Sequence, residues 1–92
     1  MLRDKPSSSD PTVLALQALA HVAGDDDMGP RFLALTGMDA DALRANADKP
    51  ATLTALLDYL MANEPDLVAT AQAIGVKPEQ LAGAARKLGS EW

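Results

Sequence analysis

The chain of 92 residues is 48% hydrophobic and carries a formal net charge of −5 at pH 7. Its length allows one domain with one core, and its hydrophobic content excludes wholesale disorder. Cysteine is absent, which excludes disulfides, thiolate metal sites and cysteine nucleophiles, and no apolar run approaches the ~20 residues of a membrane span. The acidic balance opposes general nucleic-acid binding, which requires clustered Lys and Arg, and because residues 1–6 lack a secretory signal we expect a cytoplasmic protein.

The hydrophobic residues are mostly helix formers. The chain contains 18 alanines and 14 leucines, but only five valines and isoleucines together and three aromatic residues. Ala and Leu favour helices, whereas strands are enriched in β-branched and aromatic side chains. We therefore predict an all-α fold, a compact bundle of five to six short helices. Because alanine buries little surface, we expect a thin core and a free energy of unfolding on the order of 3–6 kcal/mol.

In chain order, the sequence predicts a leader, six short helices and a tail. Residues 1–9 are expected to be a disordered leader, because Pro and Ser cannot bury apolar surface. Residues 10–89 form the single domain and residues 90–92 a C-terminal tail. Asp, Pro and Gly mark the helix ends as N-caps, first helical positions and left-handed C-terminal turns. They place the helices at 11–24, 29–37, 39–47, 50–62, 65–75 and 78–89.

The clearest periodicity lies at residues 50–62. The apolar positions follow the i, i+3, i+4, i+7, i+8 spacing of one helix face, and they are Leu53, Leu56, Leu57, Leu60 and Met61. Asp58 lies on the opposite side. This pattern predicts that the fourth helix is the central, buried one.

A weak internal repeat relates two parts of the chain. Gly37-Met38 aligns with Gly75-Val76, and Leu43 aligns with Leu81. Both copies read as a helix, a Gly in the left-handed conformation, an apolar residue that packs back, and a second helix. Two related helix-Gly-turn-helix hairpins would give this pattern, and so would common capping chemistry, which we favour.

Four segments carry a resemblance to a known family. They are Arg31-Phe32-Leu33-Ala34-Leu35-Thr36-Gly37, Leu43-Arg44, Leu56-Leu57-Asp58-Tyr59-Leu60 with Glu64 after it, and Gly75-Val76-Lys77-Pro78. Through them residues 11–89 resemble a family of small bacterial helical proteins catalogued as a domain of unknown function. The sequence departs from that family at Tyr59, where a plain apolar aromatic is expected, and in the loop 25–29. The resemblance implies a stand-alone helical domain and supplies no activity.

Residues suited to catalysis are sparse. His21 is the only histidine, so no His pair can bind a metal, and a single His opposite the apolar face of a helix is usually solvated. The run Asp25–Asp27 lacks the register of a calcium loop and is more typical of a helix cap. Asp58, Glu64 and Asp66 could pair as acid and base, but nothing around them indicates a pocket. We therefore expect no enzyme, no metal site and no cofactor.

A helix-turn-helix is the alternative hypothesis. Ala71, Gly75 and Leu81 have the spacing of that motif, in which a small residue and a Gly turn allow the second helix to pack on the first. The helix at 78–89 would then read DNA, through Lys77, Gln80, Arg86 and Lys87. The same spacing suits any tight helical hairpin, and the acidity of the chain weighs against nucleic acid.

We favour a non-enzymatic protein–protein interaction module, with an unknown protein partner or self-association and no membrane contact. Aromatic residues dominate the energetic centres of interfaces, so Tyr59 and Trp92 are the candidate partner-binding residues. Tyr59 is expected at the edge of the apolar stripe with its hydroxyl in water. Arg31 and Arg44 are expected to pair with local Asp residues or, alternatively, to form a small anion site.

Overall fold

The computed structural model describes residues 10–91, and the side chains of residues 10–89. This part of the chain contains six helices and no strand, which confirms the all-α prediction. The helices are α1 (Pro11–Gly24), α2 (Met28–Thr36), α3 (Ala40–Ala45), α4 (Pro50–Ala62), α5 (Glu64–Ile74) and α6 (Pro78–Glu91). The predicted leader, residues 1–9, lies outside the described residues.

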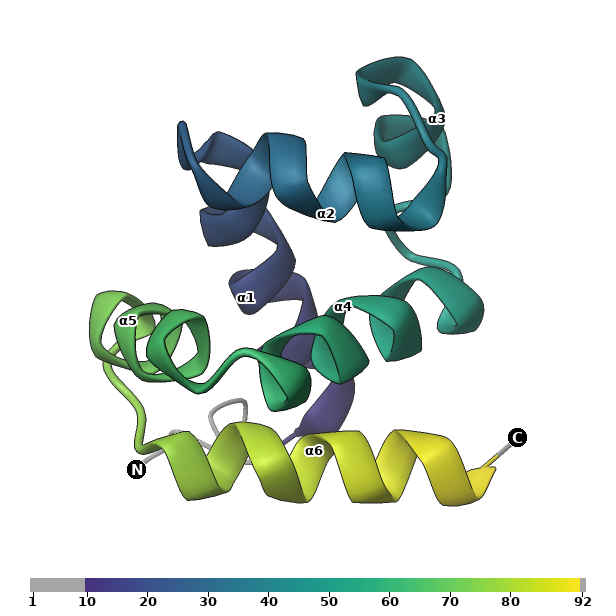
Figure 1. The fold of residues 1–92 in the computed structure, drawn as a ribbon. Coiled ribbons are helices and arrows are strands. Elements are labelled where there is room, and N and C mark those ends of the chain that lie inside the picture. Colours follow the sequence, from purple (N-terminus) through teal and green to yellow (C-terminus); the bar gives the residue numbers. More distant parts are fainter. Residues whose placement is uncertain (1–9, 92) are drawn as a thin grey trace, which may run out of the picture.

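The helices form two levels joined by α1 (Figure 1). In that view α2 crosses the top of the molecule, α4 and α5 lie below it, and α6 runs along the bottom. α1 passes behind them and packs on α6, α4, α2 and α5. α3 stands at the upper edge, with much less backbone packing against the other helices.

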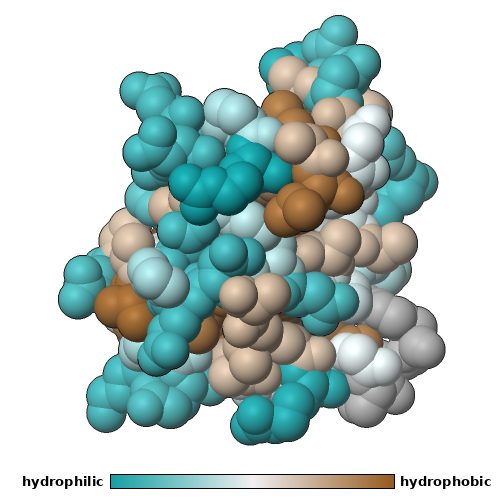
Figure 2. Space-filling model, in the orientation of Figure 1, coloured by the Kyte–Doolittle hydropathy of each residue, from teal (hydrophilic) through white to brown (hydrophobic). Residues whose placement is uncertain are grey.

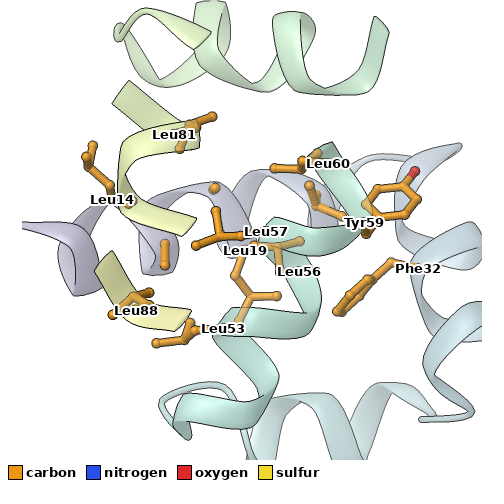
Figure 3. Close-up of a cluster of buried hydrophobic side chains, with 14 of the residues drawn as sticks. Leu14, Leu19, Phe32, Leu53, Leu56, Leu57, Tyr59, Leu60, Leu81 and Leu88 are labelled. Atoms are coloured by element: carbon orange, nitrogen blue, oxygen red, sulfur yellow. The ribbon is translucent and has the colours of Figure 1, made fainter. Parts of the chain in front are cut away.

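The core is built around α4, as predicted. Leu53, Leu56, Leu57 and Leu60 are at most 1% exposed, and Figure 3 shows them among leucines from α1 and α6. Met61 was expected on the same face but is 47% exposed. At 100° per residue, Met61 lies about 80° round the helix from Leu53, which places it at the edge of the buried stripe.

Local hydrogen bonds fix the helix ends where the sequence predicted them. The carboxylate of Asp10 accepts from the backbone N–H of Thr12 at 2.9 Å, and that of Asp39 accepts from Ala42 at 2.7 Å. Gly37 and Gly75 have φ values of +76° and +79°, the left-handed conformation that ends α2 and α5. The two members of the weak repeat therefore share a left-handed Gly, but the next residue differs: the N–H of Val76 donates to the carbonyl of Ala71, whereas that of Met38 donates to the hydroxyl of Thr36.

The end of α6 differs from the prediction. Gly89 was expected to close the helix, but α6 continues to Glu91. Gly37 and Gly75 are the only described residues with a positive φ, so Gly89 keeps a right-handed backbone and the helical hydrogen bonding continues through it. Residues 90 and 91 thus extend the last helix.

A glycine at the start of α2 allows α1 and α2 to cross closely. A Cβ atom placed on Gly29 would lie 3.1 Å from the carbonyl oxygens of Val22 and Ala23, so the absence of a side chain sets this approach. The crossing leaves one side of α1 facing α3 across a hollow.

Candidate functional site

An apolar groove lies between α1, α2 and α3. Its volume is about 370 Å³, within the range of pockets that bind ligands in proteins. Nine of the ten lining residues are apolar or glycine, and Arg44 is the exception. The lining residues are Leu16, Leu19, Ala20, Ala23, Gly29, Leu33, Ala40, Leu43, Arg44 and Ala47.

The groove is open because alanines occupy positions where larger side chains would meet. Ala20 and Ala23 of α1 lie across from Ala40 and Ala47 of the α3 region, and a methyl group cannot span the space that a leucine would fill. Leu43, 6% exposed, anchors α3 to the core. The structure thus leaves apolar surface open to solvent on this side.

The polar edge of the groove is formed by one ion pair. Nη1 of Arg44 lies 3.0 Å from Oδ1 of Asp41, and the two side chains are 75% and 91% exposed. An ion pair with this exposure contributes little to stability. This contact confirms the local pairing expected for Arg44, and it places both charges at the mouth of the groove.

A second polar cluster joins α2, α4 and α5. The hydroxyl of Tyr59 donates to Oδ2 of Asp66 at 2.5 Å. Nη1 of Arg31 donates to the same oxygen at 2.7 Å and to the Tyr59 hydroxyl at 3.3 Å. One carboxylate therefore connects three helices. Arg31 was expected to pair with a local Asp, but its partner lies 35 residues along the chain, because α2 passes over the start of α5.

The expected exposed position of Tyr59 was wrong. Tyr59 is 5% exposed, and its ring centroid lies 5.8 Å from that of Phe32. Figure 3 shows the two rings next to each other. Burial, reinforced by the hydrogen bond to Asp66, raises the pKa of Tyr59 above its ordinary value. The burial is possible because Asp66 replaces the water that would otherwise bind the hydroxyl. Tyr59 serves as a structural residue here, and its predicted role in partner binding stays untested.

The residues proposed to contact DNA lie on or just before α6, three of them around one hollow, and their predicted role in DNA binding stays untested. Gln80 uses its side chain to accept from the backbone N–H of Lys77 at 2.9 Å, which caps α6. Gln80, Arg86 and Lys87 line a hollow of about 270 Å³ against the start of α1. Glu79 is exposed on the same helix. α6 packs along α1, α4 and α5, so much of its surface serves the core.

The other sequence-predicted groups take structural or solvent-facing positions. The side chain of Asp25 accepts from the N–H groups of Asp27 and Met28 at 2.8 and 2.9 Å, which lowers the pKa of Asp25. His21 is half-buried in the last turn of α1, while Asp58 and Glu64 are exposed. Trp92 lies outside the described residues. Between residues 10 and 91 no cluster of His, Asp and Glu could hold a metal ion, and no helix has the length and hydrophobicity to cross a bilayer.

Sequence reasoning missed the groove. Its signal was a second apolar stripe on the first helix, at Leu16, Ala20 and Ala23, beside the buried stripe of Leu14, Ala18 and Val22. The two stripes together looked like one wide core face. Alanine-rich positions facing α3 are what leave the second stripe uncovered.

Comparisons with known proteins identify a family and no activity. Residues 8–91 match the model of the family described as Protein of unknown function (DUF3572), and because this match covers most of the chain, the chain belongs to that family. No curated protein and no solved structure matches the sequence or the fold significantly.

Proposed function

We propose that this member of the family is a non-enzymatic, cytoplasmic interaction module that binds an apolar segment of a partner protein in the groove between α1, α2 and α3. The observation that carries the proposal is the exposed apolar lining, in which Leu16 is 36% exposed. A concave, mostly apolar hollow of this kind is the form that binding sites in proteins commonly take. Figure 2 shows one face of the molecule, on which hydrophobic surface lies in several separate areas between hydrophilic side chains.

The chemistry of the lining supports binding over catalysis. Arg44 is its only ionisable residue, and a guanidinium stays protonated and cannot act as a general base. The groove also offers no carboxylate, imidazole or hydroxyl among its lining residues. A single cation is equally a poor match for a nucleic-acid backbone, which is bound by several.

A matched pair of substitutions tests the proposal. Leu16→Glu places a charge in the groove, whereas Leu35→Glu makes the same change at an exposed position of α2 that does not line it. The wild type and both variants are immobilised and exposed to nuclease-treated lysate of the native cells. We expect the same partner on the wild type and on L35E, and its loss on L16E. Circular dichroism melts check that both variants fold.

The partner is then purified and titrated into labelled protein. Amide shifts at Ala20, Ala23 and Ala40 would place it in the groove. Equal capture by L16E and wild type, equal losses by both variants, or no specific capture would each overturn the proposal.

A further inference from the structure

The shape of the groove suits a helix. On α1 the lining runs from Leu16 through Ala20 to Ala23, two helical turns or about 10 Å. The opposite wall runs from Ala40 to Ala47. An amphipathic helix presents anchors over the same length at i, i+3 or i+4, and i+7.

Backbone chemistry disfavours a strand-like occupant. A strand-like segment in the groove would need partners for its N–H and C=O groups, and peptide-binding domains supply them from a sheet edge. Residues 10–91 contain no strand, and nine of the ten lining side chains are apolar or glycine. A helix satisfies its own backbone and needs only apolar contact.

The charges around the groove select the partner. Residues 10–49, which form its walls, contain seven Asp and three basic residues, a net charge of −4, whereas residues 50–89 contain four acidic and three basic residues, a net charge of −1. Of the three basic residues in 10–49, Arg31 is bound to Asp66 and Arg44 to Asp41.

The acids of this half adjoin the lining residues. Asp25–Asp27 connects Ala23 to Gly29, Asp39 precedes Ala40, and Asp48 follows Ala47. Charges of one sign around an apolar groove attract a partner of the opposite sign and hold it in register. Resting on the proposed function, we propose that the occupant is a basic amphipathic helix, with an apolar face of Leu-sized anchors flanked by Lys or Arg.

Two synthetic peptides test this inference directly. Both carry the same Leu/Ala face on a helix of four turns, and one has Lys and the other Glu at the solvent-facing positions. Each is titrated into ¹⁵N-labelled protein. We expect the Lys peptide to shift the amide signals of Leu16, Ala20, Ala23 and Ala40. It should bind at least about tenfold more tightly than the Glu peptide, and its affinity should fall as the salt concentration rises.

Charge-matched variants show whether the acids near the groove are responsible. Asp26→Asn, Asp27→Asn and Asp48→Asn together remove three exposed charges beside it while sparing the cap formed by Asp25. The control, Asp58→Asn with Glu64→Gln and Glu79→Gln, removes three exposed charges elsewhere. We expect the first triple variant to bind the Lys peptide about fivefold more weakly than the wild type does. The control variant should lose less than about twofold in affinity.

Several outcomes would overturn the inference. Equal or tighter binding of the Glu peptide would show that the partner is not basic, and shifts outside the groove would show that the helix docks elsewhere. Failure of both peptides to bind would also exclude a basic helix as occupant. Self-association in sedimentation that L16E abolishes would identify a second copy of this chain instead. The proposed function is judged separately, by the L16E and L35E captures.

Discussion

The two sides of α1 are packed in opposite ways. On the side of α4 and α6, Leu57, Leu60, Leu81 and Leu88 are at most 1% exposed, and Figure 3 shows their side chains filling the space between the helices. On the side of α3, only Leu43 is buried from that helix, and an open hollow remains.

Side-chain volume accounts for the contrast. Both sides of α1 are apolar, and both meet other helices. Leucines from α4 and α6 fill the first interface, whereas at the second the small side chains of Ala20, Ala23, Ala40 and Ala47 lie among the leucines and leave space unfilled. Hydrophobicity alone therefore does not decide where a small bundle has its core, and the size of the apolar residues decides which face remains available for binding.

Truncating one leucine on each side tests the contrast most strongly. Leu57→Ala removes a side chain from the filled interface and is expected to lower the free energy of unfolding by about 3–4 kcal/mol. Leu43→Ala opens a site already beside the groove and is expected to cost about 1–2 kcal/mol. Urea denaturation followed by circular dichroism measures both. Equal losses would show that α3 is packed as firmly as α4.

Enlarging one alanine on each side gives the complementary test. Ala18→Leu overfills the closed interface and is expected to destabilise by about 1–3 kcal/mol. Ala20→Leu, two residues later on the same helix, extends into the groove and is expected to change stability by less than about 0.5 kcal/mol. Thermal melts compare the two variants, and the Lys peptide should no longer bind to A20L. A large stability loss in A20L would mean that the groove closes in solution.

The polar cluster is expected to lose part of its contribution to stability at high pH. Tyr59→Phe removes the hydroxyl bonded to Asp66 and is expected to cost about 1–2 kcal/mol at neutral pH. Folding raises the pKa of Tyr59. The contribution of its hydroxyl to the stability of the wild type is therefore fully present below a pH of about 10, and it is lost as the pH rises through the folded-state pKa. Y59F should lack that part of the decline. Denaturation midpoints between pH 8 and 11 check it, and identical slopes would contradict it.

The smallest global effect is expected at the cap of α3. Asp39→Ala removes the acceptor for the N–H of Ala42, a loss of about 0.5–1 kcal/mol confined to this helix. Because α3 packs loosely, its opening should leave the core intact. Hydrogen exchange is expected to quicken at Leu43 and Arg44 while Leu57 and Leu60 keep their protection. Faster exchange throughout the protein would show that α3 and the core unfold together.

Local chemistry made most of the fold predictable. Pro50, with Leu53 to Leu60 at helical spacing, located the central helix, and Asp10, Gly37 and Gly75 marked helix ends. These signals act within one or two helical turns, so they can be recognised in the sequence without knowledge of the tertiary structure.

The sites depend on contacts between distant residues, which the sequence does not display. The partner of Tyr59 is Asp66, and their contact follows from the turn at Asn63 between α4 and α5. Arg31 reaches the same carboxylate only because α2 crosses the bundle. The groove depends on where α3 lies relative to α1, and six residues of helix give no pattern that predicts that position.

The packing of α6 on α1 has a consequence for synthesis on the ribosome. α1 packs more extensively on α6 than on any other helix, and Leu81, Ala84 and Leu88 complete the core that Leu14 begins. A nascent chain that still lacks α6 exposes that apolar surface, and such surface promotes aggregation. The core therefore closes only after α6 has left the exit tunnel.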